Sequence, residues 1–493
     1  MSSLARQQAE RAARLPGVVH ALGMPDIHAS NSGLPNGFVL GTNGTIFPKA
    51  IGGDICCGMT LFATGLHRND LGDQDDVYAL MRQAAAAVNL GHKTNTVQLA
   101  PADLERILAH GIAALPELSA ATRNAHPVWD LLTTDYIVRQ RDFMEHGGSL
   151  AGNVAAVPQA ARRNGERQLG TVGEGNHFVE LQRIHKVLDA DAAAALGLQH
   201  SKITLMIHTG SRGLGHAVGD HYAQRARNLG LAAGQTTSVK DVYPLAINTA
   251  EGDAYLGAMQ AAANFAYANR VVVSALVLLA LREEFPHMDA KPVYDVAHNM
   301  VYTERHGEEE LVVHRKGATR AFDAARMAGT RFTALGQPIL IPGSMGTASY
   351  VALGQSGSTA SLASVNHGSG RRLSRSEALG VRLTTEETWD DGAAERRMRT
   401  ISDADFAKSM RGVALVTAEE LMREQRTAKR EKQHGSRDSG HREPHAPGGS
   451  GRSTIKGEAP GAYKDIHDVM DVVFTEGWAT GVVELRPVGV LKE

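Results

Sequence analysis

The sequence predicts a protein built from both helices and strands. Two long stretches, 75–165 and 251–285, have apolar residues at helical spacing, whereas the other segments are short apolar runs broken by Gly, Asn and Ser. Hydrophobic residues make up 43% of the 493 residues, which is enough for a large core. Length alone would suggest about three domains.

Charge and cysteine content narrow the class of protein. The net charge is −2, so a globally basic nucleic-acid binder is excluded and any basic surface must be local. The only two cysteines are adjacent, which argues against a disulfide framework and fits a reducing compartment. The first 14 residues hold no apolar signal core, and the longest apolar run, 271–281, is too short to span a bilayer. We therefore expect a cytoplasmic protein that does not enter a membrane.

The first half of the chain predicts strands, then helices, then a strand again. In order, we expect a short helix within 1–20, a Pro/Gly loop at 23–28, a strand with a Thr-Asn-Gly hairpin turn over 38–48, and a strand within 51–66. The acidic start at Asp75 and Asp76 suits a helix amino terminus, and Pro101 opens a second helical segment. Residues 169–181 return to strand-and-turn character.

The second half predicts buried strands that end in polar residues, a common place for chemistry. The expected strands are 203–207, 293–298, 311–315, 338–342 and 482–490, with helices near Ala217 and over 251–285. Residues 421–457 are rich in Lys, Arg, His, Gly and Ser and cannot bury enough apolar surface to fold alone. We expect a disordered basic insertion there, and the alternative is a basic flap that contacts RNA phosphates.

The stretch from Gly52 to Met59 carries the strongest chemical signal. It holds both cysteines and places Asp54 three residues before Cys57. Thiolate and carboxylate ligands favour transition metals, although free cysteines are also common as small buried hydrophobes. Histidines recur downstream in short Gly-, Asn- and Ser-rich segments, which together predict a metal-centred active site.

The candidate ligands exceed the needs of one tetrahedral ion. They are Asp54, Cys57, His177, His208 and His298. A thiolate can bridge two metals, and two metals beside Arg and Lys suit phosphoryl chemistry. His367 lies among glycines and arginines and could act as a covalent nucleophile. Spacing alone leaves nucleotidyl transfer and phosphoester hydrolysis both open.

Six motifs, in order, resemble those of the RtcB-type RNA-splicing ligases. They are the segments 53–59, 175–180, 208–213, 315–318, 342–346 and 367–371, and Tyr463 to Ile466 and Lys492 also fit. The resemblance implies one large α+β domain over 1–493, with a sheet-built core wrapped by helices. Cys56 stands where the family usually has glycine and Ser369 where it usually has alanine, which suggests a divergent paralogue.

The resemblance also implies an activity and a role for each motif residue. The family's ligases use manganese and GTP to join an RNA 3′-phosphate or 2′,3′-cyclic phosphate to a 5′-hydroxyl, in tRNA splicing or RNA repair. By motif, the five candidate ligands would hold two manganese ions, His367 would carry GMP, and Asp26 would sit beside the centre. Arg212, Lys316 and Arg375 would hold phosphates. The guanylate pocket would comprise Asn176, Glu180, Ser344, Ser349, His367, Gly368, Gly370, Tyr463 and Lys492.

Two other functions remain open at this point. A two-metal phosphoesterase on the same fold would need the metals but not His367, and a non-catalytic RNA-binding paralogue would depend on 421–457. The sequence does not decide the physiological RNA, the oligomeric state, the metal in the cell, or the need for an archease-like activating protein.

Overall fold

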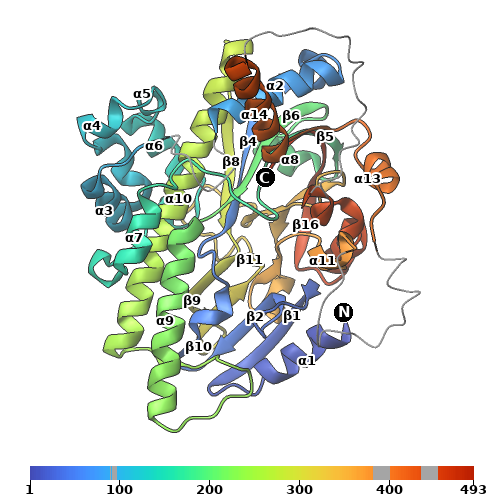
Figure 1. Cartoon of the computed structure of the whole chain (residues 1–493). Coiled ribbons are helices and arrows are strands. Elements are labelled where there is room, and N and C mark those ends of the chain that lie inside the picture. Colours follow the sequence, from blue (N-terminus) through green and yellow to red (C-terminus); the bar gives the residue numbers. More distant parts are fainter. Residues whose placement is uncertain (89, 91–96, 381–399, 435–453) are drawn as a thin grey trace.

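An eight-stranded sheet forms the centre of the computed structural model, which describes residues 1–88, 90, 97–380, 400–434 and 454–493 (Figure 1). Seven strands follow the order β12-β13-β16-β5-β6-β4-β8, all antiparallel, and β15 lies parallel to β16. Their bounds are β4 Gly58–His67, β5 Phe178–Val187, β6 Lys202–Thr209, β8 Lys291–Ala297, β12 Pro338–Ile341, β13 Ser349–Gly354, β15 Ala414–Thr417 and β16 Ala479–Lys492.

Both faces of this sheet are buried, which explains the unbroken apolar runs in the sequence. Along β6, Leu205 and Ile207 pack in one apolar cluster and Met206 packs in another on the opposite face. The first face lies against α10 (Ala250–Glu284), whose side chains are buried over most of its length. This helix is long and apolar enough to cross a membrane by length and composition only, but 94% of its apolar window is buried inside the protein.

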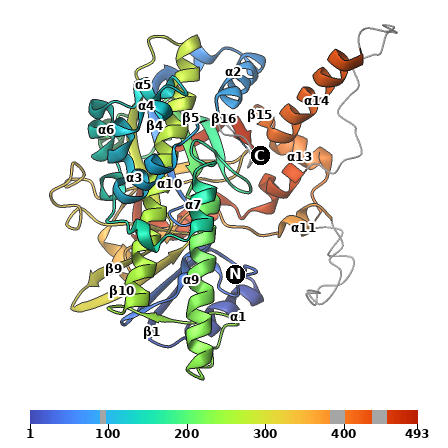
Figure 2. The same cartoon turned by 60° about the vertical axis from the view of Figure 1, so that its left-hand side comes forward.

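The helical region predicted for 75–165 packs around α10, with residues 101–141 on one side of it and residues 74–87 on the other, as Figures 1 and 2 show. A capping box at Asp73 starts α2, and Pro101 occupies the first turn of α3. The helices of this region, with η for 3₁₀, are α2 Gln74–Ala87, α3 Pro101–His110, η3 Gly111–Glu117, α4 Ala120–Arg123, α5 Val128–Leu131, α6 Thr134–Arg141, η4 Glu145–Gly148, η5 Val154–Ala156 and α7 Gln159–Gly165. The prediction of a helical scaffold here is confirmed.

A smaller four-stranded sheet, in the order β1-β2-β10-β9, lies at the other end of the molecule (Figure 1). Its strands are β1 Val18–His28, β2 Asn36–Thr42, β10 Glu309–Lys316 and β9 Asn299–His306. The predicted loop at 23–28 is wrong, because these residues end β1. The pairing of β1 with β2 is irregular between Gly23 and His28, and this break accommodates Pro25, which has no N–H to donate.

The predicted hairpin over 38–48 is also wrong, although its turn residues do change the chain direction. After β2, the chain enters β3 (Thr45–Ile46), which pairs with β7 (Leu245–Ala246) and not with β2. Both edges of β2 are already occupied, by β1 and by β10. The last two-stranded pair joins β11 (Ala318–Arg320) to β14 (Ser364–Asn366).

The predicted disordered insertion at 421–457 is ordered at both described ends. The helix α14 (Ala418–His434) covers its start, and η7 (Thr454–Glu458) its end; residues 435–453 lie outside the described residues. The start is ordered because α14 is tied to α2: Tyr78 Oη donates to Glu420, and Arg82 donates twice to Glu424. Beyond these contacts α14 projects from the body of the protein (Figure 2).

The remaining helices lie outside the sheets and the helical region described above. They are α1 Ser3–Ala12, η1 Pro48–Ile51, η2 Arg68–Leu71, α8 Ala190–Ala195, α9 Arg212–Ala232, η6 Ser356–Ser361, α11 Arg375–Ala378, α13 Asp403–Ser409, η8 Pro460–Ala462 and α15 Ile466–Thr475. One apolar cluster extends from Ile46 to Leu491 and includes the central sheet, α10 and the helices packed around it. The prediction of one large α+β domain is therefore confirmed, and the three-domain estimate from length is wrong.

A buried ion pair supports the loop that carries the cysteines. Arg270, on α10, donates from Nε and one terminal nitrogen to both carboxylate oxygens of Asp295, at 2.8 Å each. Its other nitrogen donates to the carbonyl oxygens of Cys56 and Thr209, at 2.7 and 3.1 Å. The fifth N–H donates to the Cys56 sulfur at 3.7 Å. All five donor hydrogens of the guanidinium are thus engaged away from water, so this helix holds the cysteine loop in one position.

We expect Asp295→Ala to lower the free energy of unfolding by about 3–5 kcal/mol, because it leaves the Arg270 charge buried without its partner. Urea unfolding followed by fluorescence measures the change. The matched control is Glu105→Ala, which removes a partly exposed ion pair with Arg162 and should cost about 0–1 kcal/mol. Equal losses in the two variants would contradict the role assigned to Arg270.

Candidate active site

Five electron-rich side-chain atoms converge at one edge of the central sheet. Cys57 Sγ lies 3.2 Å from Nε2 of His177 and 3.2 Å from Nε2 of His208. His208 Nε2 lies 3.4 Å from His298 Nε2, and His177 Nε2 lies 3.1 Å from an Asp54 oxygen. The structure therefore brings together all the residues that we predicted as metal ligands: Asp54, Cys57, His177, His208 and His298.

Strand register explains how residues so far apart in sequence meet. His177 immediately precedes β5, His208 lies near the end of β6, and His298 immediately follows β8. Phe178 pairs with His208 across β5 and β6, while Gly58 of β4 pairs with both Thr209 and Ala297. Neighbouring antiparallel strands thus bring one start and two ends to the same edge, and the loop before β4 adds Asp54 and Cys57.

The three imidazoles, but not the thiol, have the protonation that metal binding requires. His177 Nδ1 lies 3.0 Å from the carbonyl oxygen of Val172, so Nδ1 carries the proton and Nε2 presents its lone pair to the cluster. Burial lowers the pKa of His177, His208 and His298, which keeps these imidazoles neutral. Burial, with the Asp54 charge adding to it, raises the pKa of the Cys57 thiol, so a bound cation would have to displace that proton.

The Asp54 carboxylate is turned toward the cluster by its own hydrogen bonds. One oxygen accepts from the Arg212 backbone N–H at 2.9 Å and from the Ser211 hydroxyl at 3.2 Å. Burial would raise the pKa of Asp54, but His177, His216 and Arg212 outweigh it and the net pKa is lowered. Gly210 allows this approach, because a Cβ there would lie 2.6 Å from the carboxylate. A carboxylate, a thiol and three imidazoles at these distances fit a transition-metal centre.

Cys56 shapes the loop without joining the cluster. Its φ of 55° lies in the left-handed region that favours glycine, and its sulfur lies 3.7 Å from Arg270 rather than near the histidines. A glycine would adopt this φ without strain, which fits the glycine that the resemblance leads us to expect at this position. The Arg270 hydrogen bond to the Cys56 carbonyl oxygen holds the conformation.

His367 lies beside the cluster with one ring nitrogen already occupied. Its ring centroid is 4.9 Å from that of His298, and its Nδ1 lies 2.7 Å from a carboxylate oxygen of Asp26. That oxygen also accepts the His367 backbone N–H at 3.3 Å, and the Asp26 side chain is fully buried. The carboxylate fixes the proton on Nδ1, so Nε2 is left with a free lone pair for nucleophilic attack.

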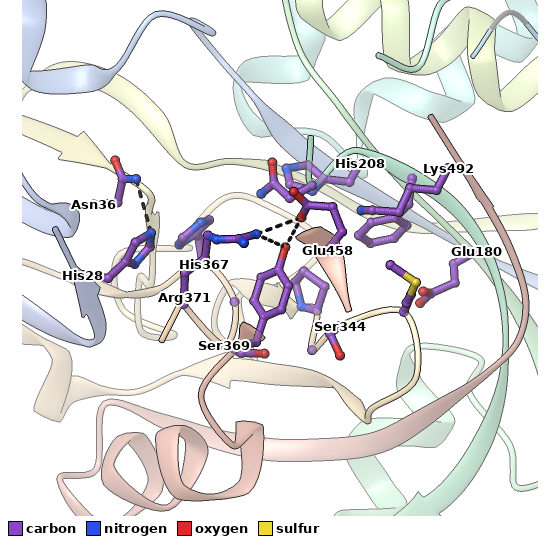
Figure 3. A pocket seen from close by; sticks show the side chains of 18 of the residues that line it. His28, Asn36, Glu180, His208, Ser344, His367, Ser369, Arg371, Glu458 and Lys492 are labelled. Atoms are coloured by element: carbon purple, nitrogen blue, oxygen red, sulfur yellow. Dashed lines mark hydrogen bonds and ion pairs between the residues drawn. The ribbon is translucent and has the colours of Figure 1, made fainter. Parts of the chain in front are cut away.

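A cavity of about 240 Å³ opens on one side of His367 (Figure 3). Its lining includes most of the residues predicted to bind a nucleotide. They are Asn176, Glu180, Ser344, His367, Gly368, Gly370, Arg375, Tyr463 and Lys492. Asp26 lies directly behind His367.

The walls of this nucleotide-sized cavity carry opposite charges at defined places. Glu458 accepts hydrogen bonds from Arg371 at 3.1 Å and Arg375 at 2.5 Å and from the Tyr463 hydroxyl. Burial would raise the pKa of Glu458, but Lys492 and the two arginines lower it, so it is a carboxylate. Sequence reasoning missed Glu458, because it lies next to the basic tract with no motif around it, and only the fold brings it to these arginines.

A second cavity, of about 320 Å³, opens on the metal side of His367. Its lining includes Asp54, Cys57, His177 and His298, together with Ser30, Ser32, Asn36, Asn299 and Lys316. Three residues border both cavities: Asn36, Asn176 and His367. His367 therefore lies at the boundary between a nucleotide-sized space and the cavity that holds most of the candidate metal ligands, while His208 of the cluster lines the first cavity.

Three predicted residues have contacts that differ from their expected roles. Ser349 is buried behind the cavity wall, where its hydroxyl bonds Gln182 and the Gly343 N–H. The Arg212 guanidinium lies over Gly173, where any Cβ would overlap it, and neither cavity lining includes it. Lys316 lines the second cavity, but its Nζ donates to oxygens of the 30–34 loop. These contacts stabilise the site, and contact of Arg212 and Ser349 with a ligand stays a prediction.

Comparison with known proteins gives one consistent result. Residues 8–414 match the family model described as tRNA-splicing ligase RtcB. The chain is 34% identical to the tRNA-splicing ligase RtcB of Thermococcus kodakarensis, over 99% of this chain and 90% of the relative. It is 33% identical to the RNA-splicing ligase RtcB of Mycobacterium tuberculosis, over 98% of this chain and 100% of the relative. It is also 34% identical to RNA-splicing ligase RtcB homolog 1 of Entamoeba dispar, over 76% of this chain and 69% of the relative.

We expect Cys57→Ala to weaken Mn²⁺ binding by at least about tenfold, because it removes the one ligand atom that lies within 3.2 Å of two of the histidines. Isothermal titration calorimetry with Mn²⁺ measures the affinity. The matched control is Cys56→Ala, whose sulfur faces Arg270 instead, and which should bind Mn²⁺ as the wild type does. Unchanged affinity in Cys57→Ala would rule out the proposed centre.

Proposed function

Because the chain belongs to the RtcB family of tRNA-splicing ligases, we propose that it is an RNA ligase that uses GTP and manganese. It joins an RNA 3′-phosphate or 2′,3′-cyclic phosphate to a 5′-hydroxyl through a guanylyl-histidine at His367. The observation that carries this proposal is the position of His367. Its Nε2 is free, its Nδ1 is bonded to Asp26, and it stands between two cavities, one of them lined by the metal-type donors.

His367 accounts for the first step. The lone pair of Nε2 attacks the α-phosphorus of GTP, the bond from phosphorus to the bridging oxygen breaks, and pyrophosphate leaves. The imidazole gains positive charge as the new P–N bond forms, and the Asp26 carboxylate, 2.7 Å from Nδ1, stabilises that charge. Asp26 also fixes the ring orientation through the His367 backbone N–H.

The later steps use the same imidazole as leaving group. An oxygen of the RNA 3′-phosphate attacks the guanylyl phosphorus, the P–N bond breaks and Nε2 recovers its lone pair. The 5′-hydroxyl of the second RNA then attacks the 3′-phosphorus, a 3′,5′-phosphodiester forms and GMP leaves. The two cavities on either side of His367 provide separate places for the guanylate and for the RNA ends.

The donor set fits two divalent cations, with Asp54, Cys57, His177, His208 and His298 as ligands. When bound, such ions neutralise phosphate oxygens and orient the attacking and leaving groups. The residues themselves supply the preorganisation: His177 is fixed by Val172, and Asp54 by Ser211 and the Arg212 backbone. Manganese is our proposal for the ion, since Cys, His and Asp ligands accept several metals.

Charged groups in the nucleotide cavity suit a guanylate. A carboxylate can accept hydrogen bonds from the N1–H and N2–H₂ groups of guanine, and Glu180 is the carboxylate at the far end of the cavity from His28 (Figure 3). Arg371, Arg375 and Lys492 supply positive charge for phosphate oxygens.

The physiological setting follows the family, and we propose a cytoplasmic role in tRNA splicing or RNA repair. The proposed substrate is RNA with a 3′-phosphate or 2′,3′-cyclic phosphate end and a 5′-hydroxyl end, and an archease-like protein is a candidate activator. Two alternatives predict a different role for His367. A two-metal phosphoesterase would need the metal ligands but not His367, and an RNA-binding paralogue would need neither.

Incubation with Mn²⁺ and GTP labelled at the α-phosphate should leave label on the denatured protein. We expect wild-type protein to be labelled and His367→Ala to be unlabelled, with an adduct that is stable to base and labile to acid, as a phosphoramidate is. Asp26→Asn should reduce the labelling rate by about 10²-fold or more, because an amide no longer stabilises the charged ring. His20→Ala is the control, because His20 is a half-exposed histidine that lines neither cavity, and it should label normally. Absence of label on metal-loaded wild type would favour the phosphoesterase.

The preference for GTP over ATP should rise with pH. Burial raises the pKa of Glu180 to about 7, against the opposing effects of Gln182 and Lys492. The carboxylate is ionised in about one-tenth of molecules at pH 6 and about nine-tenths at pH 8, so the affinity ratio should rise about tenfold between them. The ratio is measured by competition binding and cancels pH effects on the triphosphate. Glu180→Gln should give a low, flat ratio; the same pH dependence in this variant would exclude Glu180.

A further inference from the structure

Asn36 stands at the boundary between the two cavities and has no part in the mechanism so far. It is the first residue of β2, and its side chain borders both the nucleotide cavity and the metal cavity. The next residue, Gly37, packs directly against the catalytic groups: a Cβ at Gly37 would lie 2.4 Å from an Asp26 oxygen. Figure 3 shows Asn36 and His28 on the His367 side of the cavity, across from Glu180 and Lys492.

The orientation of the Asn36 amide is set by His28. His28 Nδ1 lies 3.0 Å from the carbonyl oxygen of Asp26, an atom that only accepts, so Nδ1 carries the proton. Burial lowers the pKa of His28 to about 4, so the ring is neutral and its Nε2 can only accept. Asn36 Nδ2 lies 3.3 Å from this Nε2, and its NH₂ group is the donor that the ring requires. The carbonyl oxygen of the Asn36 amide must therefore point the other way.

The loop before Asn36 is anchored, so this oxygen has a defined place. The Lys316 Nζ donates to the hydroxyls of Ser30 and Ser32, at 3.0 Å each, and to the carbonyl oxygen of Leu34 at 2.6 Å. Lys316 is itself buried at the end of β10, which pairs with β2. The chain is thus held on both sides of Asn36, by Lys316 before it and by strand pairing after it.

The carbonyl oxygen Oδ1 of Asn36 can bind only some of the groups on a nucleotide. Within the described residues, no side chain or backbone group donates a hydrogen bond to Asn36 Oδ1. A carbonyl oxygen repels phosphate oxygens and attracts a donor, and Glu180 is placed to take the donors of the base across the cavity (Figure 3). The remaining donors on a ribonucleotide are the hydroxyl groups of the sugar.

We propose that Asn36 Oδ1 accepts a hydrogen bond from a ribose hydroxyl of the substrate beside His367, and that His28 is the positioning residue that orients this amide. The proposal rests on the proposed function for its substrate, and it adds a residue that distinguishes ribose from deoxyribose. Two riboses approach His367 in the steps that form and break its bond to the guanylate: that of the guanosine nucleotide and that of the RNA 3′ end. The ribose with the 5′-hydroxyl reacts only after the guanylate has left His367.

The experiment compares ribose with deoxyribose at each position. Wild type, Asn36→Leu and His28→Leu are assayed for self-guanylylation with GTP, 2′-deoxy-GTP and 3′-deoxy-GTP. They are then assayed for ligation of RNA whose 3′-phosphate-bearing nucleotide has a 2′-hydroxyl or is 2′-deoxy. Asn31→Leu is the matched control, because Asn31 is an exposed asparagine of the same loop that lines neither cavity. Thermal melting verifies that each variant is folded.

In one of the two assays, self-guanylylation or ligation, we expect wild type and Asn31→Leu to react about two- to tenfold faster with the ribose form than with the deoxyribose form. This factor is the value of one neutral hydrogen bond. Asn36→Leu should abolish that preference by lowering the rate with the ribose form alone. His28→Leu should reduce it while Asn36 is retained, which a purely structural role of His28 would not do. The preference appears in self-guanylylation if Asn36 contacts the ribose of the nucleotide, and in ligation if Asn36 contacts the ribose of the RNA 3′ end.

A preference that persists unchanged in folded Asn36→Leu, or no preference in an active wild type, would overturn the inference. Its failure can be distinguished from failure of the proposed ligase. Binding of short 3′-phosphorylated oligonucleotides, ribo- or 2′-deoxy-terminated, is measured in Mn²⁺ by fluorescence anisotropy. If wild type forms no guanylyl adduct but binds the ribo end more tightly, and Asn36→Leu does not, the ligase proposal fails and this one stands. If a wild type that forms no adduct binds the ribo- and 2′-deoxy-terminated oligonucleotides equally, the result contradicts the ligase proposal and the Asn36 proposal alike.

Discussion

The register of four neighbouring strands is the constraint on which the site depends. Because β5, β6, β4 and β8 pair antiparallel, the residues just before β5, near the end of β6 and just after β8 meet at one edge, and the loop before β4 completes the cluster. A shift of one residue in any pair would turn a ligand to the opposite face. The buried ion pair of Arg270 and Asp295 stabilises this arrangement, because Arg270 also donates to the carbonyl oxygen of Cys56 in the cysteine loop.

The arrangement around His367 shows how one residue can serve two spaces. Asp26 occupies Nδ1, which leaves the lone pair on Nε2, and the cavities on the two sides of His367 have different linings. The nucleotide cavity presents cations balanced by Glu458, whereas the metal cavity presents neutral imidazoles and a thiol. The loop anchored on Lys316 closes the boundary and carries Asn36 to it. An imidazole at the boundary of the two spaces suits a group that passes from one to the other.

The main elements could be predicted from sequence because their signals are local. The helical periodicity of α2 and α10 and the apolar runs of β6 and β12 were sufficient to locate them. The failures involve partners distant in sequence. The 23–28 segment has the composition of a loop but belongs to β1, which pairs with β2. The strand β3 pairs with β7, about 200 residues away in sequence, and no local turn signal predicts that contact. The start of the basic tract is helical because it is tied to α2.

The sequence by itself determined the family, because the order of the motifs is written in it, and residue identity predicted the candidate metal ligands and the candidate nucleophile. Only the tertiary structure decided which groups act together. Glu458 beside Arg371, Arg270 beneath Cys56, and Asn36 oriented by His28 are contacts between distant segments. Ser349 and Arg212, which we predicted to contact the nucleotide, are not among the residues that line the two cavities described. The physical reason is that side-chain direction and burial depend on strand register and helix packing, which no local pattern contains.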